Sequence, residues 1–371
     1  MRILLDYRPA LRQRTGVGQY VHEMASAVQP QLSSHESLTL FSSSWADRLD
    51  PAAVPGAQIR DVRLPVRWLN LAWHRLEWPP VERLAGRADI AHSSHPLLMP
   101  SRRAAQVVTI YDLDFLDHPE RTRAEIRRDY PSLAAAHARR ADLVVVISQH
   151  TAAAVAARFG IGGERVVICR PGAPDWAPRA QPAVAGPILF VGTIEARKNL
   201  PALVAAYEEV VSRRPDAPPL VLAGGHVEGS AAILESVARR ERLRGRVSHP
   251  GYVTDAERQE LYRTASMLVL PSLEEGFGLP ALEAMQMGVP VVASRRGALP
   301  EVVGEAGTLI DPEDTADLAR AIDSLLDDPG LRIAHVAAGI ERAREFSWRA
   351  SAGRLLEAYR EVLARRRSMP A

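Results

Sequence analysis

The sequence contains almost no cysteine and almost no lysine. Its 371 residues include one cysteine, Cys169, and one lysine, Lys198, so every other residue counted as Lys or Arg is arginine. A single cysteine forms neither an intrachain disulfide nor a cysteine-based metal site, which fits a reducing compartment. The net charge is only +2, so no basic excess favours a nucleic-acid partner. Any basic site must therefore be local.

Long apolar runs are also missing. No stretch approaches the roughly 20 apolar residues of a membrane-spanning helix. The apolar run near the N-terminus is closed by Asp6 and is too short for the core of a signal peptide. We therefore expect a cytoplasmic protein, and leave peripheral contact with the inner face of the cell membrane open.

Short apolar runs alternate with helical patterns along the whole chain. Residues 2–6 precede a helical stretch at 19–28, and residues 187–192 precede one at 199–211. This alternation is typical of an α/β fold with a parallel sheet covered on both faces. The length favours two domains rather than one.

A stretch rich in proline and glycine, residues 170–187, separates the two halves. We interpret it as the linker between two Rossmann-like domains, residues 1–175 and 176–345. Residues 346–371 form an amphipathic pattern after the last strand, which predicts a C-terminal helix. Two such domains place a ligand-binding cleft at the carboxyl ends of their strands.

The most informative segment is P-S-L-E-E-G-F-G-L-P-A-L-E-A-M, which begins at Pro271. It predicts a strand end, a glycine loop and a helix whose first turn holds Pro280. Free N–H groups at a helix N-terminus bind anions. Glu275 and Glu283 bracket the loop, and ionised carboxylates accept hydrogen bonds from hydroxyl groups. A nucleotide sugar offers both phosphates and hydroxyls. The plainer interpretation is that Glu275 is a solvated loop residue and Glu283 a charge favoured near the start of a helix.

This segment resembles the E-x7-E signature of retaining glycosyltransferases of family 4, which have the GT-B fold. The resemblance extends to T-G-V-G-Q-Y, V-G-T-I-E-A-R-K-N-L, L-V-L-A-G-G and H-P-G-Y-V-T-D-A-E. It implies two Rossmann-like domains facing across a cleft, the first on the acceptor side and the second binding the nucleotide sugar. It also implies that the C-terminal helix crosses back and packs on the N-terminal domain.

The resemblance also implies roles for individual residues. Glu275 would contact the donor hexose and Glu283 the ribose. The other donor-binding positions are Gly16, Gly18, Gly192, Thr193, Tyr252, Val253, Gly276, Phe277, Gly278 and Leu279. Many relatives carry an arginine where this chain has Thr193, so one usual phosphate contact is missing.

Arg197 and Lys198 match the pair that holds the donor diphosphate in the family. Cleavage of a sugar–phosphate bond develops negative charge on the leaving diphosphate, and a preorganised cation lowers that barrier. A lysine ammonium is a compact point charge, whereas an arginine is a planar fork. The plainer reading of Lys198 is a solvated loop residue.

In the first half, A-H-S-S-H-P follows a strand pattern, and relatives place a histidine there that contacts the donor sugar. We assign this role to His95 rather than His92, with Ser94 as a further alternative. The next strand pattern ends in Tyr111 and Asp112, where some relatives have His-Asp, and these are acceptor-side candidates. D-L-D, residues 112–114, resembles a metal-binding D-x-D, but we expect no metal because cationic side chains serve the diphosphate.

Three tryptophans, Trp68, Trp73 and Trp78, lie five residues apart among arginines. This spacing does not hold one face of a helix, so packing on the first domain is the plain interpretation. The alternative is an acceptor or membrane-interface surface, which suits tryptophan and arginine. A basic run nearby, including Arg121, Arg123, Arg127 and Arg128, would add attraction to anionic lipid.

Together these features predict a retaining hexosyltransferase. Its donor would be a nucleotide diphosphate sugar, with GDP-mannose as first choice. Its acceptor would be a saccharide or lipid-linked saccharide in bacterial surface polysaccharide or glycolipid synthesis. No cofactor is expected. Two alternatives remain: a nucleotide-sugar 2-epimerase of GT-B fold and a non-catalytic nucleotide-sugar-binding protein.

Overall fold

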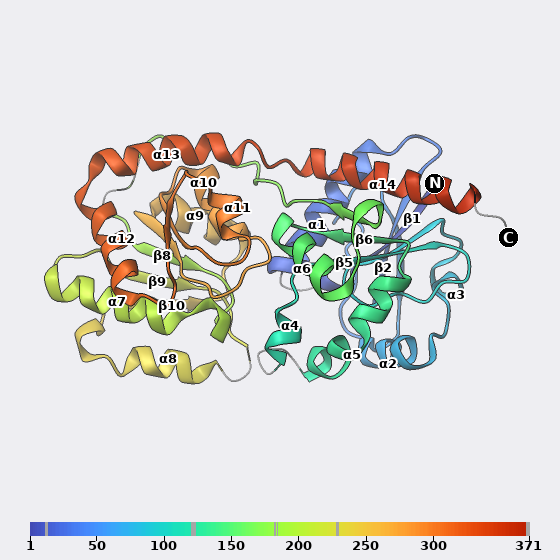
Figure 1. Ribbon diagram of the computed structural model, residues 1–371, viewed down its shortest axis with the longest axis horizontal. Coiled ribbons are helices and arrows are strands. Elements are labelled where there is room, and N and C mark those ends of the chain that lie inside the picture. The colour runs from blue at the N-terminus through green and yellow to red at the C-terminus, as the bar shows by residue number, and fades with distance from the viewer. Residues whose placement is uncertain (12–13, 120–123, 182, 184, 228–229, 369–371) are drawn as a thin grey trace. The chain divides into compact units, whose positions relative to one another are not determined.

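The computed structural model describes residues 1–11, 14–119, 124–181, 183, 185–227 and 230–368 (Figure 1). The chain forms two compact units. Unit 1 comprises Met1–Pro171 together with Ser347–Ala371, and unit 2 comprises Gly172–Phe346. Arg121 and Arg123 of the basic run lie outside the described residues.

Unit 1 is built on a 7-stranded parallel sheet of order β3-β2-β1-β4-β5-β6-β7. Its strands are β1 Arg2–Asp6, β2 Ser37–Ser43, β3 Gln58–Val62, β4 Ile90–Ser93, β5 Ala105–Ile110, β6 Leu143–Val146 and β7 Val166–Ile168. The four central strands carry almost unbroken runs of buried residues, as expected for strands covered on both faces.

The helices of unit 1 cover both faces of this sheet (Figure 1). They are α1 Gly16–Val28, α2 Val66–Leu76, α3 Val81–Ala85, α4 Asp114–Asp117, α5 Ala124–Arg140, α6 Gln149–Phe159 and α14 Trp348–Ser368. Helices α2 and α3 pack on β1, β2 and β4 through an apolar cluster that includes Trp73, Leu69, Leu4 and Phe41.

Helix α14 packs against α1 in unit 1, as expected for a C-terminal helix that crosses back. Trp348 makes an edge-to-face contact with Tyr20, and Ser351 donates a hydrogen bond of 2.5 Å to the carbonyl of Arg170. Its Tyr359 is hydrogen-bonded to Nδ1 of His92 in β4. The last helix in the sequence is therefore part of the first unit's core.

Unit 2 repeats the plan with a 6-stranded parallel sheet of order β10-β9-β8-β11-β12-β13. Its strands are β8 Ile188–Val191, β9 Leu220–Ala223, β10 Val247–Gly251, β11 Met267–Leu270, β12 Val291–Ser294 and β13 Thr308–Ile310. Its helices are α7 Leu200–Arg213, α8 Ala231–Ala238, α9 Asp255–Thr264, α10 Leu279–Met287, α11 Leu299–Val303, α12 Thr315–Asp327 and α13 Pro329–Ala343.

The order of strands in unit 2 determines where its loops gather. β8 and β11 are neighbours and run parallel, so their carboxyl ends open at the same edge of the sheet. The chain reverses its direction of travel across the sheet at this pair, which is the switch point where open α/β sheets bind ligands. The A-R-K-N and E-E-G-F-G segments follow these two strands.

Candidate active site

The loops after β8 and β11 are joined by backbone and side-chain contacts. The amide of Leu273 donates to the carbonyl of Arg197 over 2.8 Å. The A-R-K segment, residues 196–198, forms a short 3-10 helix that ends at Asn199, whose backbone is left-handed at φ 55°. Both segments are thus held rigidly at the switch point.

Lys198 and Glu275 form a buried ion pair at the centre of this edge. Lys198 is 7% exposed and Glu275 6%, and the Lys198 Nζ lies 2.5 Å from Glu275 Oε1. The same oxygen accepts a hydrogen bond of 2.8 Å from Ser272. Arg197 approaches the other carboxylate oxygen at 3.4 Å. Burial raises the pKa of Glu275, but Lys198 and Arg197 outweigh it and hold that pKa below its usual value.

Two residues of this cluster carried no signal in the sequence reasoning. Glu195 Oε1 lies 2.6 Å from Arg197 Nε, so each of the two cations contacts a carboxylate. Gly297 lies against the backbone of Glu275: a Cβ there would stand 2.5 Å from the Glu275 carbonyl oxygen. The amide of Ala298 donates to that same oxygen over 2.9 Å. Gly297 therefore lets two loops meet around Glu275.

The glycine loop ends in a helix with free amides, as the sequence predicts. α10 begins at Leu279 after Gly278, whose backbone has φ 108°. Within the described residues, the amides of Gly276, Phe277 and Gly278 donate no hydrogen bond. Unsatisfied N–H groups and the helix dipole make this end of α10 attractive to an anion. Phe277 itself is buried and packs edge-to-face on Phe346.

Glu283, the second glutamate of the signature, lies inside α10 and is also buried. The hydroxyl of Tyr262 donates to its Oε2 over 2.9 Å, and Arg258 Nη2 lies 3.3 Å from its Oε1. Arg258 in turn stands over the ring of Trp176. The carboxylate assigned to the ribose is therefore fixed in direction by α9.

The remaining predicted donor positions follow strands of the same sheet. Gly192 and Thr193 come directly after β8, and a Cβ on Gly192 would lie 3.7 Å from Lys198 Cε. Tyr252 and Val253 follow β10, two strands away at the same edge. Their part in donor binding stays a prediction.

The strand ends of unit 1 hold a second polar cluster. Asp6, fully buried at the end of β1, accepts two hydrogen bonds from the guanidinium of Arg8, of 2.8 and 2.7 Å, and one of 3.2 Å from its backbone amide. His95 Nε2 lies 3.4 Å from Asp6, while its Nδ1 accepts from the amide of Leu97. Burial raises the pKa of Asp6, but Arg8 and His95 lower it further than that. Neither Asp6 nor Arg8 was predicted as a site residue, although an acid that closes an apolar strand marks this strand end.

The other histidine of this segment is structural. His92 is enclosed between Tyr359 and Thr109, with Nε2 2.7 Å from the Thr109 hydroxyl. Burial lowers its pKa to about 3, so it is neutral at pH 7. Ser94 donates to the carbonyl of Asp6 over 2.5 Å. Of the three alternatives, only the His95 side chain is partly open to solvent.

Gly16 and Gly18 lie in the first turn of α1. A Cβ on Gly18 would stand 2.6 Å from the Pro9 carbonyl oxygen, so this glycine is required by packing within the unit. Nothing lies within 4 Å of a Cβ on Gly16, which is exposed.

Tyr111 packs edge-to-face on Tyr20, and its buried hydroxyl has no hydrogen-bond partner among the described residues. Asp112 accepts from the amide of Asp114, so D-L-D forms a local turn. The described residues hold no group of three or more His, Cys, Asp or Glu placed to bind a metal.

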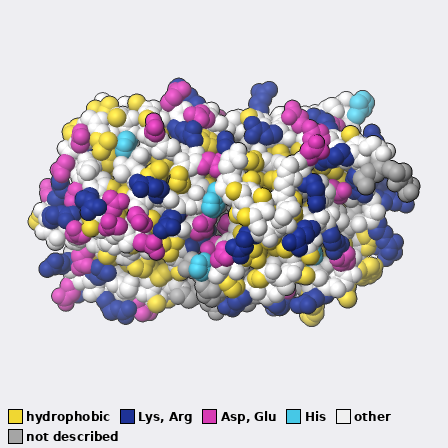
Figure 2. Space-filling model, in the orientation of Figure 1, with side chains coloured by type: hydrophobic (Ala, Val, Ile, Leu, Met, Phe, Trp, Pro, Cys, Tyr) yellow, Lys and Arg dark blue, Asp and Glu magenta, His cyan; other side chains and the backbone are white. Residues whose placement is uncertain are grey.

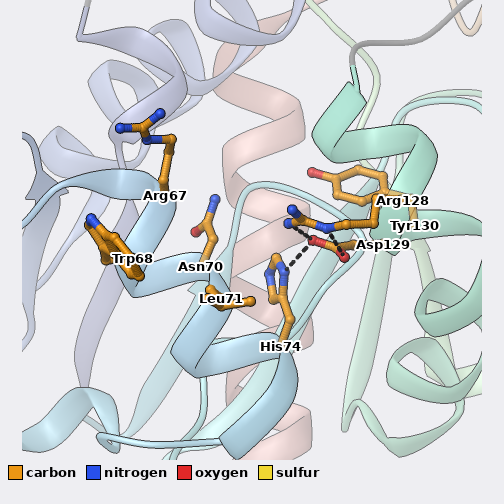
Figure 3. Close-up of a pocket in the computed structure, with 8 residues that line it drawn as sticks. All are labelled: Arg67, Trp68, Asn70, Leu71, His74, Arg128, Asp129 and Tyr130. Carbon is orange, nitrogen blue, oxygen red and sulfur yellow. Dashed lines mark hydrogen bonds and ion pairs between the residues drawn. The ribbon is translucent and has the colours of Figure 1, made fainter.

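A pocket of about 290 Å³ opens between α2 and α5 in unit 1 (Figure 3). Its walls are Arg67, Trp68, Asn70, Leu71 and His74 from α2 and Arg128, Asp129 and Tyr130 from α5. The interpretation that the three tryptophans pack on the first domain is correct for Trp73, which is buried, and wrong for Trp68 and Trp78, which are 66% and 52% exposed. None of the helices in the described ranges is long and apolar enough to cross a bilayer.

Comparisons with known proteins agree with this architecture. Residues 186–328 match the family model described as glycosyl transferases group 1, and residues 15–172 match the glycosyl transferase 4-like domain. The chain is 30% identical to O-antigen chain mannosyltransferase B of Escherichia coli over 388 residues, covering 97% of this chain and 100% of that protein.

Solved structures share the fold at lower identity. Sucrose-phosphate synthase from Thermosynechococcus elongatus superposes with a TM-score of 0.79 at 22% identity, covering 98% of this chain and 99% of that one. The Anabaena protein HepE, solved with UDP and glucose, gives a TM-score of 0.70 at 18% identity, with 97% and 100% covered.

Two parallel α/β units of this kind, with these matches, define a GT-B glycosyltransferase, an enzyme of the hexosyltransferase type. The chain belongs to glycosyltransferase family 4, among members that resemble mannosyltransferases.

The buried pair should be visible in the stability of the enzyme. We expect a double-mutant cycle of Lys198→Met and Glu275→Gln to give a coupling of about 1–3 kcal/mol in the free energy of unfolding, because each single change leaves a buried partner unpaired. The exposed pair Arg213–Glu209 in the same unit is the control and should couple by less than about 1 kcal/mol. Urea denaturation measures both; equal couplings would contradict the role of burial.

Proposed function

We propose that this enzyme transfers a hexose, with retention of anomeric configuration, from a nucleotide diphosphate sugar to a saccharide or lipid-linked saccharide. GDP-mannose is the donor we favour. The observation that carries the proposal is the buried Lys198–Glu275 pair beside the free amides of residues 276–278. A carboxylate for sugar hydroxyls and donors for phosphate stand side by side at the switch point.

The geometry suggests how charge would be handled in the reaction. When the sugar–phosphate bond breaks, negative charge grows on the diphosphate, and preorganised donors stabilise it most when they need no rearrangement. The free amides at the N-terminus of α10 are such donors, because the loop holding them is anchored through Glu275 and Gly297. Lys198 and Arg197 add positive charge at the same edge.

In this scheme Glu275 is paired with Lys198 before the donor binds and also contacts the donor hexose afterwards. Its Oε1 faces Lys198 and Ser272, and the ion pair keeps it ionised and able to accept hydrogen bonds from hexose hydroxyls. The departing diphosphate would itself take the proton of the acceptor hydroxyl, so no protein base is required. The acceptor would attack on the face that the diphosphate leaves, so no protein nucleophile is required either. Glu283, aligned by Tyr262 and Arg258, would accept from the ribose hydroxyls.

The name of one relative supports the choice of sugar and pathway, and one solved structure supports a nucleotide sugar as donor. The Escherichia coli relative is named as an O-antigen chain mannosyltransferase, and the HepE structure contains UDP and glucose. We infer a role in bacterial surface polysaccharide or glycolipid synthesis. The cytoplasmic location expected from the sequence stays a prediction.

Incubation with GDP-mannose tests the proposal and its alternatives. With an acceptor extract, we expect mannose to appear in a larger product with its anomeric configuration retained, as read by NMR. Isomerised donor would indicate an epimerase, and binding without turnover would indicate a non-catalytic protein. We expect activity to persist in EDTA; loss restored by Mn²⁺ or Mg²⁺ would contradict metal independence.

Substitutions at Lys198 test the proposed charge stabilisation. We expect Lys198→Ala to lower kcat by about 10²–10³. Lys198→Arg should also lower kcat strongly, because a guanidinium is bulkier than the buried ammonium it would replace. Arg244→Ala, an exposed change in the same unit, is the control for loss of one positive charge. A silent Lys198→Arg would show that charge alone suffices.

We also propose that α2 and the residues around it contact a membrane surface. Five of the large hydrophobic side chains that the structure leaves exposed fall within residues 64–78: Leu64, Trp68, Leu71, Leu76 and Trp78. Exposed Arg63, Arg67 and Arg75 lie among them. Figure 2 shows basic and hydrophobic side chains interspersed on the surface. Apolar side chains with neighbouring cations suit an anionic bilayer interface.

Vesicle flotation measures this contact. We expect the protein to float with vesicles containing phosphatidylglycerol more than with pure phosphatidylcholine. Leu76→Ser should reduce binding to both, and Arg75→Ser should reduce only the anionic preference, by about fivefold. Ile333→Ser, at an exposed apolar position in unit 2, is the control. Unchanged flotation of Leu76→Ser would contradict the proposal.

A further inference from the structure

We infer that the pocket between α2 and α5 binds the phosphate-bearing sugar of an amphiphilic acceptor, whose lipid chain meets the exposed face of α2. This inference rests on the proposed transferase function and assigns its acceptor a class and a site.

The first observation is the direction of Asn70. Its side-chain oxygen accepts a hydrogen bond of 2.7 Å from Arg8. A guanidinium only donates, so the atom facing Arg8 must be the oxygen, and the NH₂ group points away from it. In Figure 3 that nitrogen points from α2 into the space between the two helices. The buried Arg8–Asp6 pair thus orients Asn70 so that the two N–H donors of its amide face a ligand.

The second observation is an uncommitted cation near those donors. Arg67 lies one turn before Leu71 on α2, and its guanidinium forms no hydrogen bond or ion pair within the described part of the chain. Arg128, across the pocket, is committed to Asp129 by hydrogen bonds of 2.8 and 2.7 Å. Arg67 and Asn70 together therefore offer an anion donors that no described residue occupies, and a phosphate accepts bidentate contacts of this type.

The third observation is a buried hydrogen-bond acceptor. His74 is 8% exposed, its Nδ1 lies 3.3 Å from the Asp129 carboxylate, and its Nε2 has no partner among the described residues. Burial and nearby His95 lower the pKa of His74 to about 4 despite Asp129, so the ring is neutral. Because Asp129 accepts the Nδ1 proton, Nε2 carries a lone pair. The atom is covered in this structure, and a sugar hydroxyl would satisfy it once the side chains that cover it move aside.

The fourth observation is that the polar pocket and the apolar surface share residues. Trp68 and Leu71 line the pocket and are also 66% and 39% exposed. On a helix, positions three apart lie on one face, so these two side chains form a continuous edge. A free sugar phosphate would use only the polar side of this edge. A ligand that matches both sides has a phosphosugar head and a hydrocarbon chain.

Three soluble probes separate these contributions by isothermal titration calorimetry: mannose 1-phosphate, octyl mannoside, and mannose joined to octanol through a phosphodiester. We expect the phosphodiester to bind tightest. Arg67→Ala and Asn70→Asp should each weaken the phosphodiester at least about tenfold and leave octyl mannoside unchanged. Asn70→Asp keeps an oxygen that faces Arg8, replaces the outward N–H donors with an oxygen and adds a negative charge, and both changes oppose binding of a phosphate. Trp68→Ala should weaken both octyl compounds.

Arg349→Ala, an exposed change in α14, is the control variant and should bind all probes as the wild type does. Equal affinity for the phosphodiester and octyl mannoside, or wild-type affinity in Arg67→Ala and Asn70→Asp, would overturn the inference. Tight binding of mannose 1-phosphate alone would overturn the lipid part. Thermal stabilisation by GDP-mannose is recorded on each preparation: if it persists while pocket binding fails, this inference falls and the proposed function stands.

Discussion

The ion pair between Lys198 and Glu275 holds together the donor edge of unit 2, the edge of the sheet where β8 and β11 end and where the donor is proposed to bind. It joins the loops after two neighbouring strands, and its two residues, both buried, are 77 positions apart in sequence. A buried carboxylate without a partner would take up a proton or leave the site. Here the ammonium, Arg197 and Ser272 keep it ionised and fixed in direction. The free amides of residues 276–278 occupy their positions because this carboxylate is anchored on both its side chain and its backbone.

Unit 1 also has a buried ion pair at the ends of its strands. The Asp6–Arg8 pair is buried and reaches outward through Asn70 and His95. Arg8 also stands over the ring of Trp73, at 5.0 Å from the ring centre to the guanidinium carbon. The same guanidinium therefore orients polar groups and packs on the apolar core. In both units a buried ion pair sets the direction of side chains that a ligand would meet.

The order of apolar and helical patterns predicted parallel sheets with helices on both faces, because period and length mark strands and helices. The return of the C-terminal helix to the first unit was implied by the family resemblance and not by these patterns. The E-x7-E string placed Glu275 at a glycine loop before a helix, since glycine, proline and strand patterns mark those turns. Asp6, Arg8, Glu195 and Gly297 escaped prediction for a different reason. Their importance comes from strand neighbours and loop packing, as when Gly297 lets two distant loops meet, and single-sequence patterns do not encode such proximity.

The spacing of the tryptophans predicted only part of their arrangement. It showed that the three could not share one helical face, and Trp73 is indeed enclosed while Trp68 and Trp78 are exposed. It could not show that Trp68 borders a pocket, because the opposite wall comes from α5, roughly sixty residues later. The orientation of Asn70 is equally invisible in sequence, since it follows from a contact with Arg8 across the unit.

The scarcity of lysine gives the donor edge an unusual spectroscopic property. Because Lys198 is the chain's single lysine, isotopic labelling of that amino acid alone introduces one side-chain amine signal into the whole enzyme. That signal belongs to the nitrogen facing Glu275. Arrival of a diphosphate, its departure, or the binding of a sugar to the carboxylate each changes the surroundings of this one nucleus. The side-chain nitrogen of Lys198 therefore reports on the place where the charge of the diphosphate is expected to change.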